Sequence, residues 1–136
     1  MRRGPIPLLM HASIEPVAAI ILIASSWIFG FSDNSAAQVV TIVIGAIMLV
    51  AGAMTDWRLS LVRLIPLRAH FMTDLVLGVV LIISPFVFGY SSNGAATRFA
   101  IIFGALELLT ALSTRWEQPD ELTGTRLRGT GPHAAH

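Results

Sequence analysis

The stretch SPFVFGY, residues 84–90, closes a long apolar segment, and residues 25–31 of the same chain read SSWIFGF. Residue 84 aligns with residue 25, a shift of 59 positions, and the alignment continues on both sides without a gap. About a third of the aligned pairs are identical, which predicts a duplicated unit. Chance apolar similarity would not align the following pairs: His11 with His70, Glu15 with Asp74, Asn34 with Asn93, Gly45 with Gly104 and Trp57 with Trp116.

The composition indicates a membrane protein. Hydrophobic residues make up 54% of the 136-residue chain and charged residues only 12%, whereas a soluble domain carries about 25% charged residues. The chain has no cysteine, so disulfides, thiolate metal sites and cysteine nucleophiles are excluded. The net charge is +1 and the arginines lie at segment ends, so nucleic-acid binding is not expected.

Four apolar segments of about 19 residues each could cross the roughly 30 Å hydrocarbon core of a bilayer as helices. They span residues 13–31, 36–54, 72–90 and 95–113. Only SDNS and SSNG separate the members of each pair, which predicts two antiparallel helical hairpins. Both copies then enter the membrane the same way, related by a pseudo-two-fold axis along the membrane normal. The predicted fold is all-α, with four transmembrane helices in two tandem hairpins.

Charge placement predicts the orientation of the chain. Positively charged loops stay cytoplasmic, and every arginine except Arg98 falls on the side of the termini, so both termini are expected in the cytoplasm and the protein in the plasma or inner membrane. The opening MRRGPIPLLM also fits a secretory or twin-arginine signal, but a removable leader has no reason to be copied as the third segment. The predicted parts are a cytoplasmic N-terminal segment (1–12), the first hairpin (13–54), a basic interfacial linker (55–71), the second hairpin (72–113) and a polar, disordered cytoplasmic tail (114–136).

The segment SPFVFGY, preceded by HFMTDLVLGVVLII, resembles the SPW-repeat family of small membrane proteins, whose repeat carries a Ser-Pro-Trp motif in the first of two transmembrane helices. The resemblance covers about residues 11–117. It implies the fold and a membrane location, and it implies no activity. The motif is divided between the copies, and its residues here are Ser25, Ser26, Trp27 and Gly30 in the first copy and Ser84, Pro85, Phe86 and Gly89 in the second.

The motif has a structural and a functional interpretation. Pro85 removes a backbone donor and would kink the helix or end its regular hydrogen bonding, while Ser84 could bond the freed carbonyl. Gly89 with the aromatic residue after it is typical of a helix end at headgroup level. An opened backbone could instead bind an ion or small substrate, as broken helices do in transporters. The structural interpretation is favoured because the break lies at the end of the segment and not at its middle.

Small residues and tryptophans are expected to serve packing and anchoring. Small side chains at spacings of four and seven lie on one helical face and let helices approach closely. The tryptophans fall near predicted membrane interfaces, where an indole N–H can stay wet. The small residues are Thr41, Gly45, Gly52, Ala100, Gly104 and Ala111, and the tryptophans are Trp27, Trp57 and Trp116.

Two polar pairs stand at the start of the first and third segments. His11 with Glu15 and His70 with Asp74 are spaced i, i+4, so each pair shares one helical face. Together they could supply two imidazoles and two carboxylates to a metal or a proton relay. The favoured interpretation is simpler: the dipole stabilises carboxylates near a helix N-terminus, and Pro16 suits a first turn. No metal and no cofactor are therefore expected.

Glu107 is the one ionisable residue deep in an apolar segment, and its counterpart in the first copy is Met48. Inserting such a group costs on the order of 2.5 to 3.5 kcal/mol, which makes it a functional hypothesis. Thr110, Thr41 or a histidine are candidate hydrogen-bond partners. A structural or assembly role is favoured because no counter-charge is evident.

The sequence favours a non-enzymatic membrane protein that acts through interactions, as a scaffold, an accessory subunit or a homo-oligomer. Its expected contacts are the lipid bilayer and either a second copy or a membrane-protein partner. The alternative is a small oligomeric transporter or channel that uses Glu107 and the two His–carboxylate pairs. An enzyme is not expected, and no catalytic residue is assigned, because no nucleophile with a base, no sufficient ligand set and no phosphate loop is found.

Overall fold

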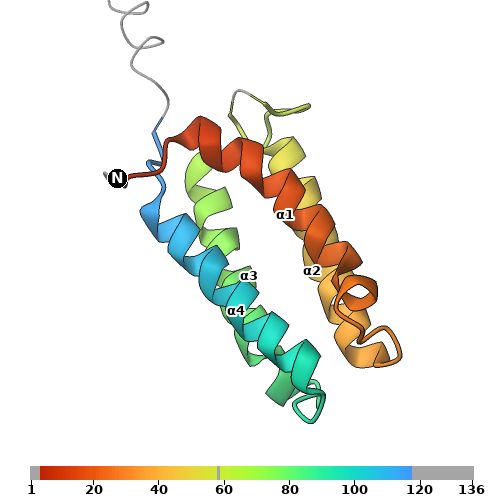
Figure 1. The fold of residues 1–136 in the computed structure, drawn as a ribbon. Coiled ribbons are helices and arrows are strands. Elements are labelled where there is room, and N and C mark those ends of the chain that lie inside the picture. Colours follow the sequence, from red (N-terminus) through yellow and green to blue (C-terminus); the bar gives the residue numbers. More distant parts are fainter. Residues whose placement is uncertain (1–3, 58, 118–136) are drawn as a thin grey trace, which may run out of the picture.

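Four long helices make up the computed structural model, which describes residues 4–57 and 59–117 (Figure 1). The helices are α1 (Leu8–Ile28), α2 (Ser35–Met54), α3 (Leu67–Val87) and α4 (Gly94–Ser113). All four are long and apolar enough to cross a membrane, so the predicted all-α fold with four transmembrane helices is confirmed. The disordered tail was predicted over residues 114–136, but Thr114 and Trp116 are buried, and residues 118–136 lie outside the described residues.

The helices pack as two hairpins, α1 against α2 and α3 against α4, and α2 also contacts α3 (Figure 1). Both tight turns lie at one end of the bundle, called here the turn end. The start of the chain, the linker between α2 and α3 and the end of α4 lie at the opposite end, called here the linker end. The buried apolar core consists of three clusters that follow one another along the bundle. They contain Phe31 and Tyr90 at the turn end, Leu22, Met48 and Leu81 in the middle, and Leu8 and Ala12 at the linker end.

Two short backbone bridges show the internal symmetry. Ile6 pairs in parallel with Thr114, and Ile65 pairs in parallel with Thr55, so the shift of 59 positions turns each bridge into the other. The first bridge joins the start of the first hairpin to the end of the second, and the other joins the end of the first to the start of the second. Such reciprocal exchange is what a two-fold axis produces, and the axis runs along the bundle because both hairpins have their turns at the same end.

The first helix of each hairpin begins earlier than predicted from the sequence. Helix α1 begins at Leu8 and α3 at Leu67, instead of at residues 13 and 72. Pro7 and Pro66 are the residues before each helix, with extended backbone (φ −63° and −60°). Proline fixes φ near the value that a helix start accepts, so the helix begins directly after it. The linker between helices is correspondingly shorter, and Pro16 lies inside α1 and not in a first turn.

The motif residues end the same two helices. Gly30 and Gly89 have φ of +76° and +74°, left-handed values at which a Cβ would be strained, so glycine suits the position that stops the helix. Ser84 Oγ donates to the carbonyl oxygen of Leu81 at 2.7 Å, the group that lacks an N–H donor because residue 85 is proline. The predicted bond from Ser84 to a freed carbonyl is confirmed, and α3 nevertheless runs on to Val87.

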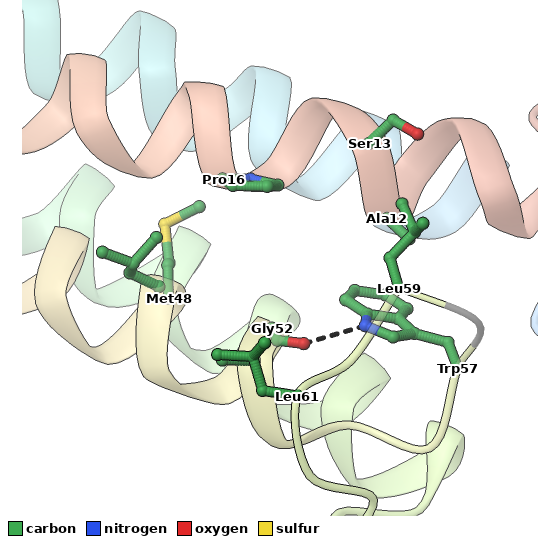
Figure 2. Close-up of a pocket in the computed structure, with 10 residues that line it drawn as sticks. Ala12, Ser13, Pro16, Met48, Gly52, Trp57, Leu59 and Leu61 are labelled. Atoms are coloured by element: carbon green, nitrogen blue, oxygen red, sulfur yellow. Dashed lines mark hydrogen bonds between the residues drawn. The ribbon is translucent and has the colours of Figure 1, made fainter.

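Two of the three tryptophans are buried at the linker end, in one apolar cluster with Leu8 and Ala12. The exposed fractions of Trp57 and Trp116 are 2% and 3%. The indole N–H of Trp57 donates to the carbonyl oxygen of Gly52 (Figure 2) and that of Trp116 to the carbonyl oxygen of Ala111, each at 2.8 Å. The prediction of wet interfacial anchors is wrong for these two, because carbonyls in the last turns of α2 and α4 accept their indole N–H groups inside the protein. Trp27, which is 59% exposed at the turn end, stays a predicted anchor.

Close helix packing generates a first prediction. A Cβ added at Gly45 would lie 2.9 Å from the carbonyl oxygen of Ala19, and one at Gly104 would lie 2.8 Å from that of Gly78. We expect Gly45→Ala and Gly104→Ala each to lower the free energy of unfolding by about 1–3 kcal/mol, because the backbone of the neighbouring helix cannot move away without disrupting that helix. Thermal unfolding in detergent, followed by circular dichroism, measures the loss. Gly52→Ala is the matched control, since its Cβ would meet nothing closer than 3.5 Å, and a similar loss there would contradict the explanation.

Candidate functional site

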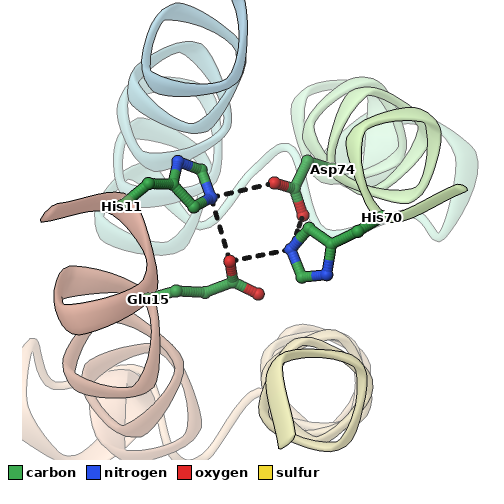
Figure 3. Close-up of side chains that lie close together, drawn as sticks. All are labelled: His11, Glu15, His70 and Asp74. Carbon is green, nitrogen blue, oxygen red and sulfur yellow. Dashed lines mark hydrogen bonds and ion pairs between the residues drawn. The ribbon is translucent and has the colours of Figure 1, made fainter. Parts of the chain in front are cut away.

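The two predicted His–carboxylate pairs meet at the linker end, where they form one four-residue cluster (Figure 3). His11 and Glu15 come from α1, and His70 and Asp74 come from α3. All four side chains are buried, the most exposed being Glu15 at 4%. One ligand atom of each residue lies within 4.8 Å of the ligand atoms of the other three, so the cluster joins the two hairpins through polar groups.

Each histidine of the cluster lies against both carboxylates. His11 Nε2 lies 2.9 Å from Glu15 Oε2 and 3.1 Å from Asp74 Oδ2. His70 Nε2 lies 2.8 Å from Glu15 Oε2 and 3.2 Å from Asp74 Oδ1. The contacts between α1 and α3 are therefore as short as those within each helix, and they depend on how the hairpins are rotated against each other.

The second nitrogen of each histidine is held by a threonine of the other repeat. His11 Nδ1 lies 2.9 Å from Thr114 Oγ1, and His70 Nδ1 lies 2.6 Å from Thr55 Oγ1. Each threonine hydroxyl donates its single proton to a carbonyl oxygen four residues earlier in its own helix. Each Nδ1–H must therefore be the donor to the threonine, which directs each Nε2 toward the carboxylates.

The threonines were not identified from the sequence. Thr55 and Thr114 align under the shift of 59 positions, and that alignment is the signal that could have found them. The internal alignment does not show which histidine each threonine contacts, however, because each threonine accepts a hydrogen bond from the histidine of the opposite repeat.

Tryptophan rings close the cluster on the side of the linker. The ring centroid of Trp57 lies 4.5 Å from that of His70, and the centroid of Trp116 lies 4.8 Å from that of His11. Aromatic walls keep water away from the cluster, so its charges must be balanced within it. Two protonated imidazoles with two ionised carboxylates would satisfy that requirement.

The expected explanation of the carboxylates by the helix dipole is wrong. Neither α1 nor α3 has an acidic residue in its first turn. Glu15 and Asp74 lie two turns inside their helices, because the helices begin at Leu8 and Leu67, and the dipole effect falls off within the first turn. The carboxylates are instead placed to face the two histidines.

Glu107 lies beside the cluster without belonging to it. It is 8% exposed, and with His11 and Glu15 it lines a cavity of about 240 Å³ between α1 and α4. Oε1 of Glu107 and Oε1 of Glu15 are both buried and have no hydrogen-bond partner among the described residues. The predicted partners Thr110 and Thr41 each donate to a carbonyl of their own helix.

The motif residues lie at the turn end, away from the cluster. Ser84 shares a hydrogen bond with the hydroxyl of Tyr90, and burial raises the pKa of Tyr90. Trp27 and Phe86, at the third motif position, are 59% and 64% exposed. These contacts shape the helix ends and the turn, which supports the structural interpretation of the motif.

The crossed hydrogen bonds generate a second prediction. Thr55→Val and Thr114→Val keep the side-chain volume but remove the acceptor of a buried histidine N–H, so each is expected to lower the free energy of unfolding by about 1–3 kcal/mol. Thermal unfolding in detergent measures the loss. Thr73→Val is the matched control, because Thr73 is only half-buried and its hydroxyl bonds to a carbonyl of its own helix. Unfolding of Thr55→Val at the wild-type temperature would show that the crossed bonds do not fasten the hairpins.

Comparison with known proteins agrees with this architecture. The sequence model of the SPW repeat domain matches residues 9–114, a stretch that contains the four-residue cluster and both motif segments. A comparison with curated proteins gave no match, and a comparison with solved structures gave none either. The match covers most of the chain, as the resemblance implied. The protein is thus a multi-pass membrane protein that belongs to the SPW repeat family.

Proposed function

We propose that this SPW repeat protein is a non-enzymatic accessory or scaffold subunit that binds a transmembrane helix of another chain. The observation that carries the proposal is an apolar groove of about 550 Å³ between α2 and α3. Small and β-branched side chains of α2 form much of its lining, among them Ala36, Val39, Val40 and Val43. Such side chains let a neighbouring membrane helix approach closely.

The groove between α4 and α1, on the other side of the pseudo-two-fold axis, is less suited to a helix. It has a similar volume of about 560 Å³, but Phe99 and Phe103 line it together with Arg98. The corresponding positions of the first groove are Val40, Ile44 and Val39. The divergence of the two copies therefore leaves one groove lined throughout by small or aliphatic residues on its α2 side, and we assign the partner helix to that groove.

The packing of the middle of the bundle supports an interaction protein over a conduit. Leu22, Met48 and Leu81 are at most 1% exposed and form one apolar cluster. They separate the polar cluster at the linker end from the turn end. Ions would have to cross this layer, and these three side chains offer no polar group to replace their hydration.

The groove generates a third prediction. With a photo-crosslinking amino acid at Val43, which lines the groove and is 49% exposed, illumination of native membranes should give a discrete protein adduct. Val50 is the matched control, because it is on the same helix and 57% exposed; there only lipid adducts are expected. Lipid adducts alone at both positions would overturn the proposal. The identity of the adduct distinguishes a second copy from a different membrane protein.

A second candidate function is a small oligomeric transporter or channel that uses Glu107 and the four-residue cluster. The cavity that Glu107 shares with His11 and Glu15 favours it. Proton or cation flux into dye-loaded vesicles that carry the purified protein, abolished by Glu107→Gln, would establish this function in place of the first.

We further propose that the linker end faces the cytoplasm and that the membrane is the plasma or inner membrane. Arg63, Arg68 and Arg115 are exposed at this end, and positively charged loops stay cytoplasmic. Reporter domains fused to either end of the chain should both be active inside the cell. An active reporter outside the cell at both ends would invert the orientation, whereas opposite results at the two ends would contradict the paired hairpins.

A further inference from the structure

We propose that the four-residue cluster binds a divalent transition-metal ion of the Zn²⁺ class. His11, Glu15, His70 and Asp74 would be its ligands. This site lies at the linker end and does not depend on the groove between α2 and α3, so it stands or falls separately from the proposed helix binding.

The spacing of the ligand atoms suits tetrahedral coordination. Zn²⁺ binds imidazole nitrogen and carboxylate oxygen at about 2.0–2.2 Å, so the ligands of a tetrahedral site lie about 3.3–3.5 Å apart. The nitrogen-to-oxygen distances in the cluster are 2.8 to 3.2 Å. Binding of an ion would lengthen these four contacts by a few tenths of an ångström, and it would bring the four ligand atoms, which lie within 4.8 Å of one another, to the equal spacing of a tetrahedron.

The threonines prepare both histidines for a metal. Because Thr55 and Thr114 accept the Nδ1–H of His70 and His11, a neutral ring presents the lone pair of Nε2 to the centre of the cluster. Metal-bound histidines almost always donate their other N–H to such an outer partner, which fixes the tautomer and the ring orientation. Here both partners are in place, and each comes from the opposite repeat.

The charge and the donor types select the class of ion. Two neutral imidazoles with two ionised carboxylates carry a charge of −2, which a dication balances in a buried site. Imidazole ligands disfavour Mg²⁺ and Ca²⁺, which prefer oxygen, and the chain has no cysteine for Cu⁺. A mixed nitrogen and oxygen set therefore favours Zn²⁺ and its neighbours in the first transition row.

A separate observation points to a ligand at this place. Glu15 is only 4% exposed. Its Oε1 is buried and has no hydrogen-bond partner among residues 4–57 and 59–117. A carboxylate that binds an ion through Oε2 can leave its other oxygen without a hydrogen bond. The cavity of about 240 Å³ that Glu15, His11 and Glu107 line gives an ion a way to the cluster between α1 and α4.

The competing explanation uses the same geometry without a metal. With both imidazoles protonated, each Nε2–H donates to the carboxylates, and the four side chains form a network of ion pairs that only locks the hairpins together. The two explanations differ in whether a metal binds, so metal binding by the whole protein decides between them.

The first experiment uses Co²⁺ as a spectroscopic probe on the full chain in detergent. The chain has two further histidines, His133 and His136, outside the described residues. Both are replaced by glutamine in every sample so that imidazole signals report only the cluster. After removal of metals with a chelator, one Co²⁺ per chain should bind with the intense visible bands of tetrahedral coordination. X-ray absorption of the Zn²⁺-loaded protein should show two imidazole ligands.

Variants then assign the site. Asp74→Asn and His70→Gln should each weaken Co²⁺ binding by at least about tenfold, and Thr55→Val, which touches no metal, by about 10- to 100-fold. Thr73→Val, at a half-buried position of α3 whose hydroxyl bonds within its own helix, should bind as the wild type does. Zn²⁺ should raise the unfolding temperature of the wild type and not that of Asp74→Asn. Absence of a tetrahedral Co²⁺ spectrum in the parent chain would overturn the proposal even where a variant fails to fold, and so would unchanged affinity in folded Asp74→Asn.

Discussion

The reciprocal hydrogen bonds between the histidine of one repeat and the threonine of the other are the contacts on which the rest of the structure depends. Each hairpin packs internally through its own helices, and between the hairpins the bundle leaves apolar grooves. At the linker end, by contrast, His11 reaches Thr114 and His70 reaches Thr55. Apolar surfaces can slide, whereas buried polar groups are satisfied in one arrangement only. The network therefore fixes the rotation of one hairpin against the other, and the cluster geometry follows from it.

The architecture could be predicted from the sequence because hydrocarbon leaves few alternatives. Four apolar segments with two short polar links permit little besides two helical hairpins, and the alignment of Gly30 with Gly89 located both turns. The internal alignment also paired His11 with His70 in advance. The distance between the two pairs could not be predicted. Spacing of i, i+4 places two groups on one face of a helix, but it does not show that the polar faces of α1 and α3 contact each other.

The errors in prediction have specific causes. The hydropathy of the first segment falls near residue 13, yet α1 already begins at Leu8 because Pro7 sets its start, and that difference of more than a turn moved Glu15 away from the helix dipole. The sequence predicts an interfacial anchor at Trp57, but the linker folds back and buries this residue over Gly52. In the first case a local proline decided the outcome, and in the second case a tertiary contact did.

The exchanged bridges, in which Ile6 meets Thr114 and Ile65 meets Thr55, have an evolutionary consequence. Because these bridges and the histidine–threonine bonds occur in symmetric pairs, a chain of half the length could form a similar bundle as an isologous pair, in which each protomer would supply the threonine that holds the histidine of the other. Fusion of two such genes removes the requirement that both halves be identical. Glu107 opposite Met48 and Arg98 opposite Val39 are substitutions that a true homodimer would have to make twice, and that a fused chain can make once.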